Sequence, residues 1–154
     1  MERRITEEQA TKAILDWLEN NGWKIICFDF PQSGTGVSLH PNNDLRTTKN
    51  KGAFIPDIVA IKNRIVVFFE NKDRFVLDDF VKVQDLRQNN DYSNSLEKLL
   101  SDYEYEQIFY GVGIVYSGNA EQRTNEHSGK IDFTVFYHKN RKISIAFDPN
   151  NIFK

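Results

Sequence analysis

Two short runs of apolar residues, separated by three polar ones, constrain the fold of this chain more than any other feature. The second run, residues 65–69, is apolar at every position. A strand that is apolar on both faces is usually buried on both faces, in the centre of a sheet. The first run, residues 58–61, can pair with it through a two-residue turn at Asn63 and Arg64. We therefore expect a buried hairpin at the centre of the fold.

The rest of the pattern predicts helices packed on a sheet. Thr6 and Gln9 form a capping-box pattern, and apolar residues at helical spacing follow as far as Leu18. This order predicts a single domain over 1–154 with a mixed sheet, of the α/β or α+β class. The other expected elements are a strand at 23–30, a short helix within 76–90, a helix from Ser93 or Ser95 to about 105, a strand at 108–116, a polar loop at 117–129 and a last hairpin of 130–137 and 142–147.

Composition limits the class of protein. The chain has 154 residues, of which 40% are hydrophobic, enough for one domain with a real core. Its net charge is −2, so a polyanion would have to bind a local basic patch. The single cysteine, Cys27, excludes an internal disulfide and fits a reducing compartment. No apolar stretch reaches the roughly 18 residues of a membrane helix, and the N-terminus lacks a secretory pattern, so we expect a cytoplasmic protein without a membrane partner.

Acidic residues stand at one end of the central hairpin. Asp57 precedes the first strand and Glu70 follows the apolar run of the second, so a turn at residues 63–64 places them opposite each other. A three-residue turn would shift this pairing by one position and still leave them neighbours. Two carboxylates about 5 Å apart repel unless a cation lies between them, and oxygen ligands suit Mg²⁺. Lys72 shares a face with Glu70 because side chains alternate along a strand. The simpler alternative is that Lys72 neutralises Glu70 and that Asp57 caps a turn after Pro56.

Pro56-Asp57, twelve intervening residues and Glu70-Asn71-Lys72 resemble the PD-(D/E)XK signature of restriction-endonuclease-like nucleases. The expected element order is also similar to that family's core of a helix, three antiparallel strands, a helix and a further strand, over about residues 5–116. The resemblance implies that Asp57, Glu70 and the backbone carbonyl of Asn71 bind Mg²⁺, or Mn²⁺ in its place. It also implies that Lys72 orients or deprotonates the attacking water.

Some members of that family place another acidic residue on the first helix. On a helical wheel of about 100° per residue, Glu7 lies near the centre of the apolar stripe that contains Ala10, Ile14 and Leu18, whereas Glu8 lies off it. A carboxylate that faces inward needs a partner, so Glu7 is the candidate third acid of the catalytic site. The alternative is a frayed first turn in which Glu7 only complements the helix dipole.

The polar segment at 31–53 leads directly into the Asp57 strand and therefore borders the candidate site. Glycines let backbone amides approach phosphates, and lysine or arginine neutralises them. This segment is the expected DNA contact unless it is only a flexible surface loop. The family resemblance also suggests that Lys82 or Gln84 reaches the site, although a solvated segment is the favoured interpretation there. The polar loop at 117–129, with Arg123, His127 and the adjoining Lys130, is a further weak candidate for a DNA contact. The candidate DNA-binding residues are Ser33, Thr35, Arg46, Thr47, Lys49 and Lys51.

Together, these features predict a Mg²⁺-dependent DNA endonuclease, of the type II restriction kind or a subunit of one. A double-strand cut needs two active sites, so we expect a homodimer or a partner subunit. One alternative is a structure-selective nuclease, such as a Holliday junction resolvase or a repair or nicking enzyme; the net charge of −2 disfavours it because resolvases of this family tend to be basic. The other is a nuclease-like protein that binds DNA or a partner protein without cutting, which the intact acids of the motif disfavour.

Overall fold

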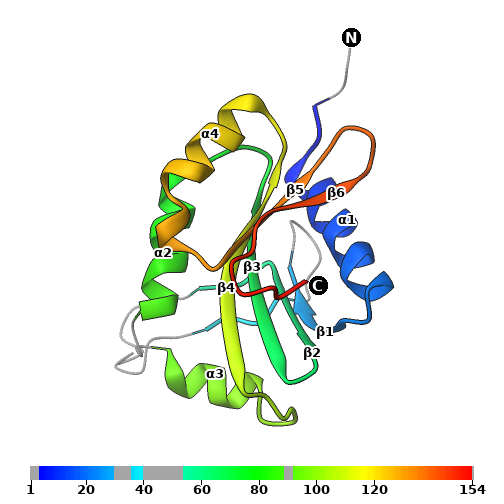
Figure 1. The fold of residues 1–154 in the computed structure, drawn as a ribbon. Helices are drawn as coiled ribbons and strands as arrows, with labels where there is room; N and C mark the ends of the chain where they lie inside the picture. The colour runs from blue at the N-terminus through cyan, green and yellow to red at the C-terminus, as the bar shows by residue number, and fades with distance from the viewer. Residues whose placement is uncertain (1–3, 30–35, 40–53, 89–91, 154) are drawn as a thin grey trace.

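The computed structural model describes residues 4–29, 36–39, 54–88 and 92–153, and they form a mixed α/β fold around one six-stranded sheet (Figure 1). The strands follow one another across the sheet in chain order. They are β1 (Lys24–Phe28), β2 (Ile58–Lys62), β3 (Ile65–Lys72), β4 (Gln107–Val115), β5 (Phe133–Tyr137) and β6 (Ile143–Phe147). The helices are α1 (Glu7–Asn20), α2 (Leu77–Gln88), α3 (Ser93–Leu99), α4 (Gly118–Glu126) and the short 3₁₀ helix η1 (Ser128–Lys130). Within the described ranges, no helix is long and apolar enough to span a bilayer.

The sheet changes direction at β3. Strands β1, β2 and β3 are antiparallel, β3, β4 and β5 run parallel, and β6 returns antiparallel to β5. Parallel neighbours need a crossover connection, which α2 and α3 supply between β3 and β4, and α4 supplies between β4 and β5. Lys72, Ile114 and Phe136 consequently lie side by side near the ends of their strands. We call this end of the sheet the carboxyl edge.

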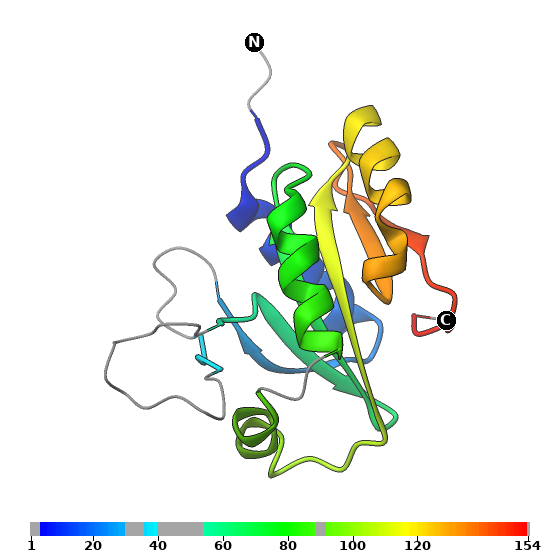
Figure 2. The same ribbon diagram turned by 90° about the vertical axis from the view of Figure 1, so that its left-hand side faces the viewer.

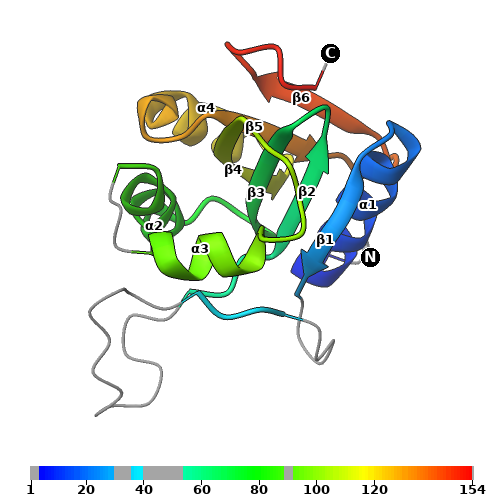
Figure 3. The same cartoon turned by 90° about the horizontal axis from the view of Figure 1, so that it is seen from below.

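Apolar cores fill both faces of the sheet. Ile14 and Leu18 of α1 pack on one face with Phe69 and Phe133, whose rings make an edge-on contact at 4.7 Å between centroids. The other face is covered by α2, α3 and α4, which pack with the second core, as the view along the sheet shows (Figure 3). Cys27 is buried in this second core, as expected for a small core residue. Burial on both faces explains why β3 is apolar throughout 65–69.

The structure confirms the predicted turn of the central hairpin. Asn63 and Arg64 have φ angles of 51° and 67°, the left-handed pair that a type I′ two-residue turn requires. Lys62 pairs with Ile65 directly beside the turn, and the register continues to Ile58 opposite Phe69. The capping box of α1 is also confirmed, because the side chains and amides of residues 6 and 9 bond reciprocally at 2.9 and 3.1 Å.

The polar loop predicted over 117–129 is wrong, because α4 occupies most of it. Ser117 caps this helix: its Oγ accepts a hydrogen bond from the amide of Ala120 at 3.0 Å. Ala120 and Thr124, four residues apart, are the buried residues of the helix. Two small side chains give almost no apolar periodicity, so the segment looks like a loop in the sequence. The helix predicted to reach about residue 105 also ends earlier, at Leu99.

Candidate metal and catalytic site

Asp57 and Glu70 lie at the carboxyl edge, where β2 begins and β3 nears its end. The register ends at Ile58 opposite Phe69, so Asp57 and Glu70 both directly follow the last pair of the ladder and lie close together, as the sequence predicts. The amide of Asp57 donates to the carbonyl of Phe69 at 3.0 Å. The Asp57 Oδ2 atom accepts a hydrogen bond from the amide of Asn71 at 2.6 Å. These two bonds hold the Asp57 carboxylate beside the end of β3.

Burial raises the pKa of both carboxyl groups. The pKa of Glu70, which is 8% exposed, rises to about 9 through burial first and then through the charges of Asp57 and Asp79. Burial raises the pKa of Asp57 to about 7, although the hydrogen bond from the Asn71 amide opposes the rise. The Oε2 atom of Glu70 is buried without a hydrogen-bond partner. Two carboxyl groups this desolvated favour a bound proton or a bound cation.

Lys72 lies between acidic groups from two helices. Its Nζ atom is 3.4 Å from Oε1 of Glu7, and both side chains are about one-third exposed. Glu7 therefore faces the sheet end, as the helical wheel predicts, and its partner is Lys72. Burial lowers the pKa of Lys72, but the charges of Asp79, Glu7 and Glu70 outweigh this effect and hold it above its ordinary value. Lys72 is consequently a protonated cation at neutral pH.

Asn71 points to the opposite face and ties β3 to α1. The fully buried side chain donates from Nδ2 to Oγ1 of Thr11 at 3.2 Å. Thr11 in turn donates to the carbonyl of Glu7 at 3.0 Å. Gly113, the β4 partner of Asn71, makes room for this side chain, since a Cβ there would lie 2.5 Å from Asn71 Oδ1. This chain of bonds fixes the first turn of α1, which carries Glu7.

Asp79 belongs to the candidate site although no pattern in the sequence indicates it. It lies in the first turn of α2, is 4% exposed, and has a buried Oδ2 without a hydrogen-bond partner. Burial raises its pKa, while the charges of Lys72 and Lys82 lower it. Asp79 lines a narrow pocket together with Glu70 and Lys72. No signal in the sequence marks it, because acidic residues are common in the first turn of any helix.

The weaker candidates have different positions. Lys82 is exposed on α2 but lines a cavity of about 280 Å³ with Glu70, and its charge lowers the pKa of Glu70. Gln84 is half-buried on the same helix and is absent from the residues that line that cavity. His127 stacks on Phe75 at 5.6 Å between ring centroids, and Arg123 lies 5.2 Å from the same ring, so both pack on the protein itself.

The residues predicted to contact DNA cannot be placed. Ser33, Thr35, Arg46, Thr47, Lys49 and Lys51 lie outside the described residues, and their role stays a prediction. The acidic segment at 101–106 is described throughout, and its Glu104 and Glu106 pair with Arg64 at 3.5 and 3.2 Å. Because Arg64 lies in the turn before β3, this acidic segment is at the end of the sheet opposite Asp57 and Glu70.

The carboxylates at the carboxyl edge suit a cation that needs only one or two protein carboxylates, rather than one that is enclosed by protein side chains. Among the residues with described positions, no group of three or more His, Cys, Asp or Glu side chains is arranged to hold a metal ion. Mg²⁺, however, is usually held by one or two carboxylates, with water and substrate phosphates completing its octahedron. The unpartnered Oε2 of Glu70, opposite Asp57, meets that requirement.

Comparison with known proteins assigns no family. No protein-family model matches the chain, and a search of curated proteins finds no significant match. A function must therefore be inferred from the chemistry of the carboxyl edge.

Proposed function

We propose that this protein is a Mg²⁺-dependent DNA endonuclease of the PD-(D/E)XK class, of the restriction type. The observation that carries the proposal is the meeting of Asp57 and Glu70 at one edge of the sheet, with a buried, unpartnered Glu70 oxygen and Lys72 beside them. The order of α1, antiparallel β1 to β3, α2 and parallel β4 supports a restriction-endonuclease-like core.

Asp57 and Glu70 would hold the cation, with the backbone carbonyl of Asn71 as the proposed third ligand. A bound Mg²⁺ or Mn²⁺ would polarise the scissile phosphate and make a coordinated water more acidic. Binding of the cation would also offset the repulsion and burial that raise the pKa values of the two carboxyl groups.

Lys72 and Glu7 would contribute to the reaction through their own side chains, independently of the cation. A protonated Lys72 can donate a hydrogen bond to a phosphate oxygen and stabilise the negative charge that builds up during hydrolysis. Glu7, at 3.4 Å, holds the lysine ammonium at the sheet end and favours its charged form. In the metal-free protein Lys72 therefore acts as a charged donor rather than as a base.

The test is cleavage of plasmid and branched DNA with Mg²⁺ or with EDTA. We expect Asp57→Ala, Glu70→Ala and Lys72→Ala each to lower the cleavage rate at least about 100-fold, because each removes a group that stabilises the transition state. Asp78→Ala, which changes an exposed acid on α2, is the matched control and should cut normally. Cooperative unfolding of every variant would show that the fold is retained.

The pattern of products separates the alternatives. Discrete fragments from plasmid support a restriction-type enzyme, whereas cutting of branched DNA alone would replace it with a structure-selective nuclease. Near-normal cutting by Asp57→Ala would refute the assignment of the site. If the protein binds DNA but cuts neither substrate with Mg²⁺ or Mn²⁺, the nuclease proposal fails.

A further inference from the structure

Arg141, in the turn between β5 and β6, differs from the other arginines that the structure describes. It makes no ion pair with a carboxylate of the described residues, and neither does its neighbour Lys142. Both side chains are exposed. The other five described arginines each have a carboxylate within 3.8 Å: Arg4 and Arg74 with Asp73, Arg64 with Glu104 and Glu106, Arg87 with Asp132, and Arg123 with Glu126. Among the described residues, the charges of Arg141 and Lys142 therefore have no carboxylate partner.

The turn lies at the carboxyl edge, beside the proposed metal site. Lys72 is in line with Phe136 across two strand spacings, which correspond to about 10 Å. The turn begins at His138, two residues further along, so it projects about 7 Å beyond this row. The β5–β6 turn, the start of α1 and the connection from β3 to α2 lie at the same end of the molecule in two perpendicular views (Figures 1 and 2).

Hydrogen bonds hold the turn in one shape. The amide of His138 donates to the carbonyl of Lys142, and the amide of Arg141 donates to that of His138, both at 2.9 Å. The His138 ring stacks on Tyr116 at 4.7 Å between centroids, and its Nε2 lies 2.7 Å from Oγ of Ser144. The turn therefore presents its cations from a fixed backbone, which lowers the entropic cost of binding a ligand.

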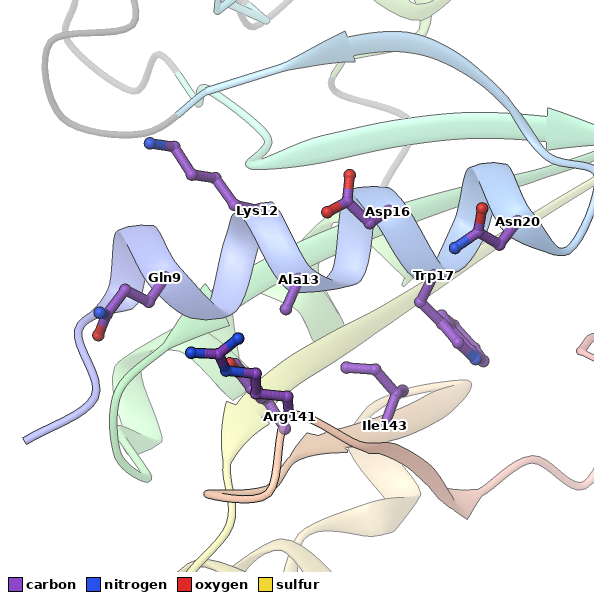
Figure 4. A pocket seen from close by; sticks show the side chains of 9 residues that line it. Gln9, Lys12, Ala13, Asp16, Trp17, Asn20, Arg141 and Ile143 are labelled. Carbon is purple, nitrogen blue, oxygen red and sulfur yellow. The ribbon is translucent and has the colours of Figure 1, made fainter.

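Arg141 also borders a groove that starts near the site. The groove, about 510 Å³, runs between α1 and the β5–β6 hairpin (Figure 4). At one end, Arg141 faces the first turns of α1, where Gln9 and Lys12 line the same groove; Gln9 is two residues from Glu7. Asp16, an acidic lining residue, lies further along the helix. Lys12 points away from Arg141 and pairs with Glu8 at 3.6 Å. The Arg141 end of the groove is thus the end nearest the Glu7–Lys72 pair.

We propose that the β5–β6 turn binds the phosphate backbone of DNA next to the scissile bond, through Arg141, Lys139 and Lys142. The inference rests on the proposed nuclease function. An arginine guanidinium matches phosphate geometry, and a protein of net charge −2 needs such a local patch to hold DNA. Offsets of about 10 Å across the strands and about 7 Å along them place the turn roughly 12 Å from Lys72, which is comparable with the major-groove width of B-DNA, about 12 Å. One duplex can therefore meet both the turn and the carboxylates.

The experiment compares two arginines in equivalent backbone settings. Arg141 and Arg64 both lie in hairpin turns with left-handed φ angles, 66° and 67°, but at opposite ends of the sheet. Binding of a short fluorescein-labelled duplex is measured by anisotropy over a salt series in EDTA. We expect Arg141→Gln to weaken binding roughly tenfold, as the loss of a charged hydrogen bond does. It should also reduce the steepness with which the logarithm of the binding constant falls with the logarithm of salt concentration (the salt slope) by about 0.9, the value for one phosphate contact. Arg64→Gln should have little effect on either quantity.

A triple variant makes the result independent of a single side chain. Replacing Lys139, Arg141 and Lys142 with Gln should lower the salt slope by about 2 to 3. The proposal is overturned if this variant binds like Arg64→Gln, or if the unmodified protein binds no duplex. If the triple variant binds DNA more weakly but the unmodified protein does not cut DNA with Mg²⁺, the role of the turn is supported and the nuclease function is refuted. If the unmodified protein cuts DNA but the triple variant binds DNA as tightly as the unmodified protein, the nuclease function is supported and the role of the turn is refuted.

Discussion

At the scale of single residues, the burial of Glu70 governs how the stability of the metal-free protein depends on pH. Burial raises its pKa to about 9 in the folded protein, against 4.5 as the ordinary value. Between these values the folded protein holds a proton that the unfolded chain releases. Because the folded state then binds more protons, stability must fall as pH rises through this range. Asp57, with a pKa raised to about 7, acts in the same direction.

We therefore expect the free energy of unfolding in EDTA to decrease from about pH 5 to about pH 9. Glu70→Gln should flatten the profile and be more stable than the unmodified protein at the alkaline end, because it removes the buried charge. Added Mg²⁺ should restore stability there only when Glu70 is present. Denaturant unfolding at several pH values measures this, with the exposed Glu97→Gln on α3 as control. A flat profile for the unmodified protein would contradict the burial argument.

At the scale of secondary-structure elements, the fit of α1 against the sheet depends on Gly113 of β4. A Cβ at this position would lie 2.4 Å from Cδ1 of Ile14 and 2.5 Å from Oδ1 of Asn71. The helix is thus packed against the strand too closely for any side chain. Since Asn71 also bonds through Thr11 to the turn that carries Glu7, the same contact positions part of the candidate site.

Gly113→Ala should therefore destabilise the protein by about 1–3 kcal/mol, the usual effect of overpacking a core. Gly118→Ala at the start of α4 is the matched change, because nothing lies within 4 Å of a Cβ there. This second variant should be neutral or slightly stabilising, as alanine is a better helix former than glycine. Chemical unfolding of both proteins decides the matter: equal free energies of unfolding would mean that α1 can move away from β4 without loss.

The same elements explain what the sequence could and could not predict. The hairpin of β2 and β3 was predictable because its apolar runs and its two-residue turn define the register, and the register brings Asp57 close to Glu70. Helix α4 was not, because its buried side is made only of small residues. Asp79 was missed because its burial depends on how α2 packs, and the parallel pairing of β5 with β4 is likewise a long-range contact without local pattern.

At the scale of the whole molecule, charge is divided between the two ends of the sheet. The turn before β3 carries Arg64, whose charge is matched by Glu104 and Glu106. The carboxyl edge carries Asp57 and Glu70 together with Arg141 and Lys142 of the β5–β6 turn, which have no carboxylate partner among the described residues. The net charge of −2 is therefore unevenly distributed over the described residues, and the proposed nuclease would bind its substrate at the carboxyl edge rather than at the Arg64 end.

The proposed nuclease has one site in each chain, so a double-strand cut needs two chains. We expect nicked plasmid to accumulate before linear plasmid, with linear product rising more steeply than in proportion to protein concentration. Mixing the protein with excess Asp57→Ala should favour nicking, since a mixed pair has one working site. Gel time courses over a dilution series measure both effects. If linear product formed first, in proportion to protein concentration and regardless of the inactive variant, each chain would have to cut both strands by itself.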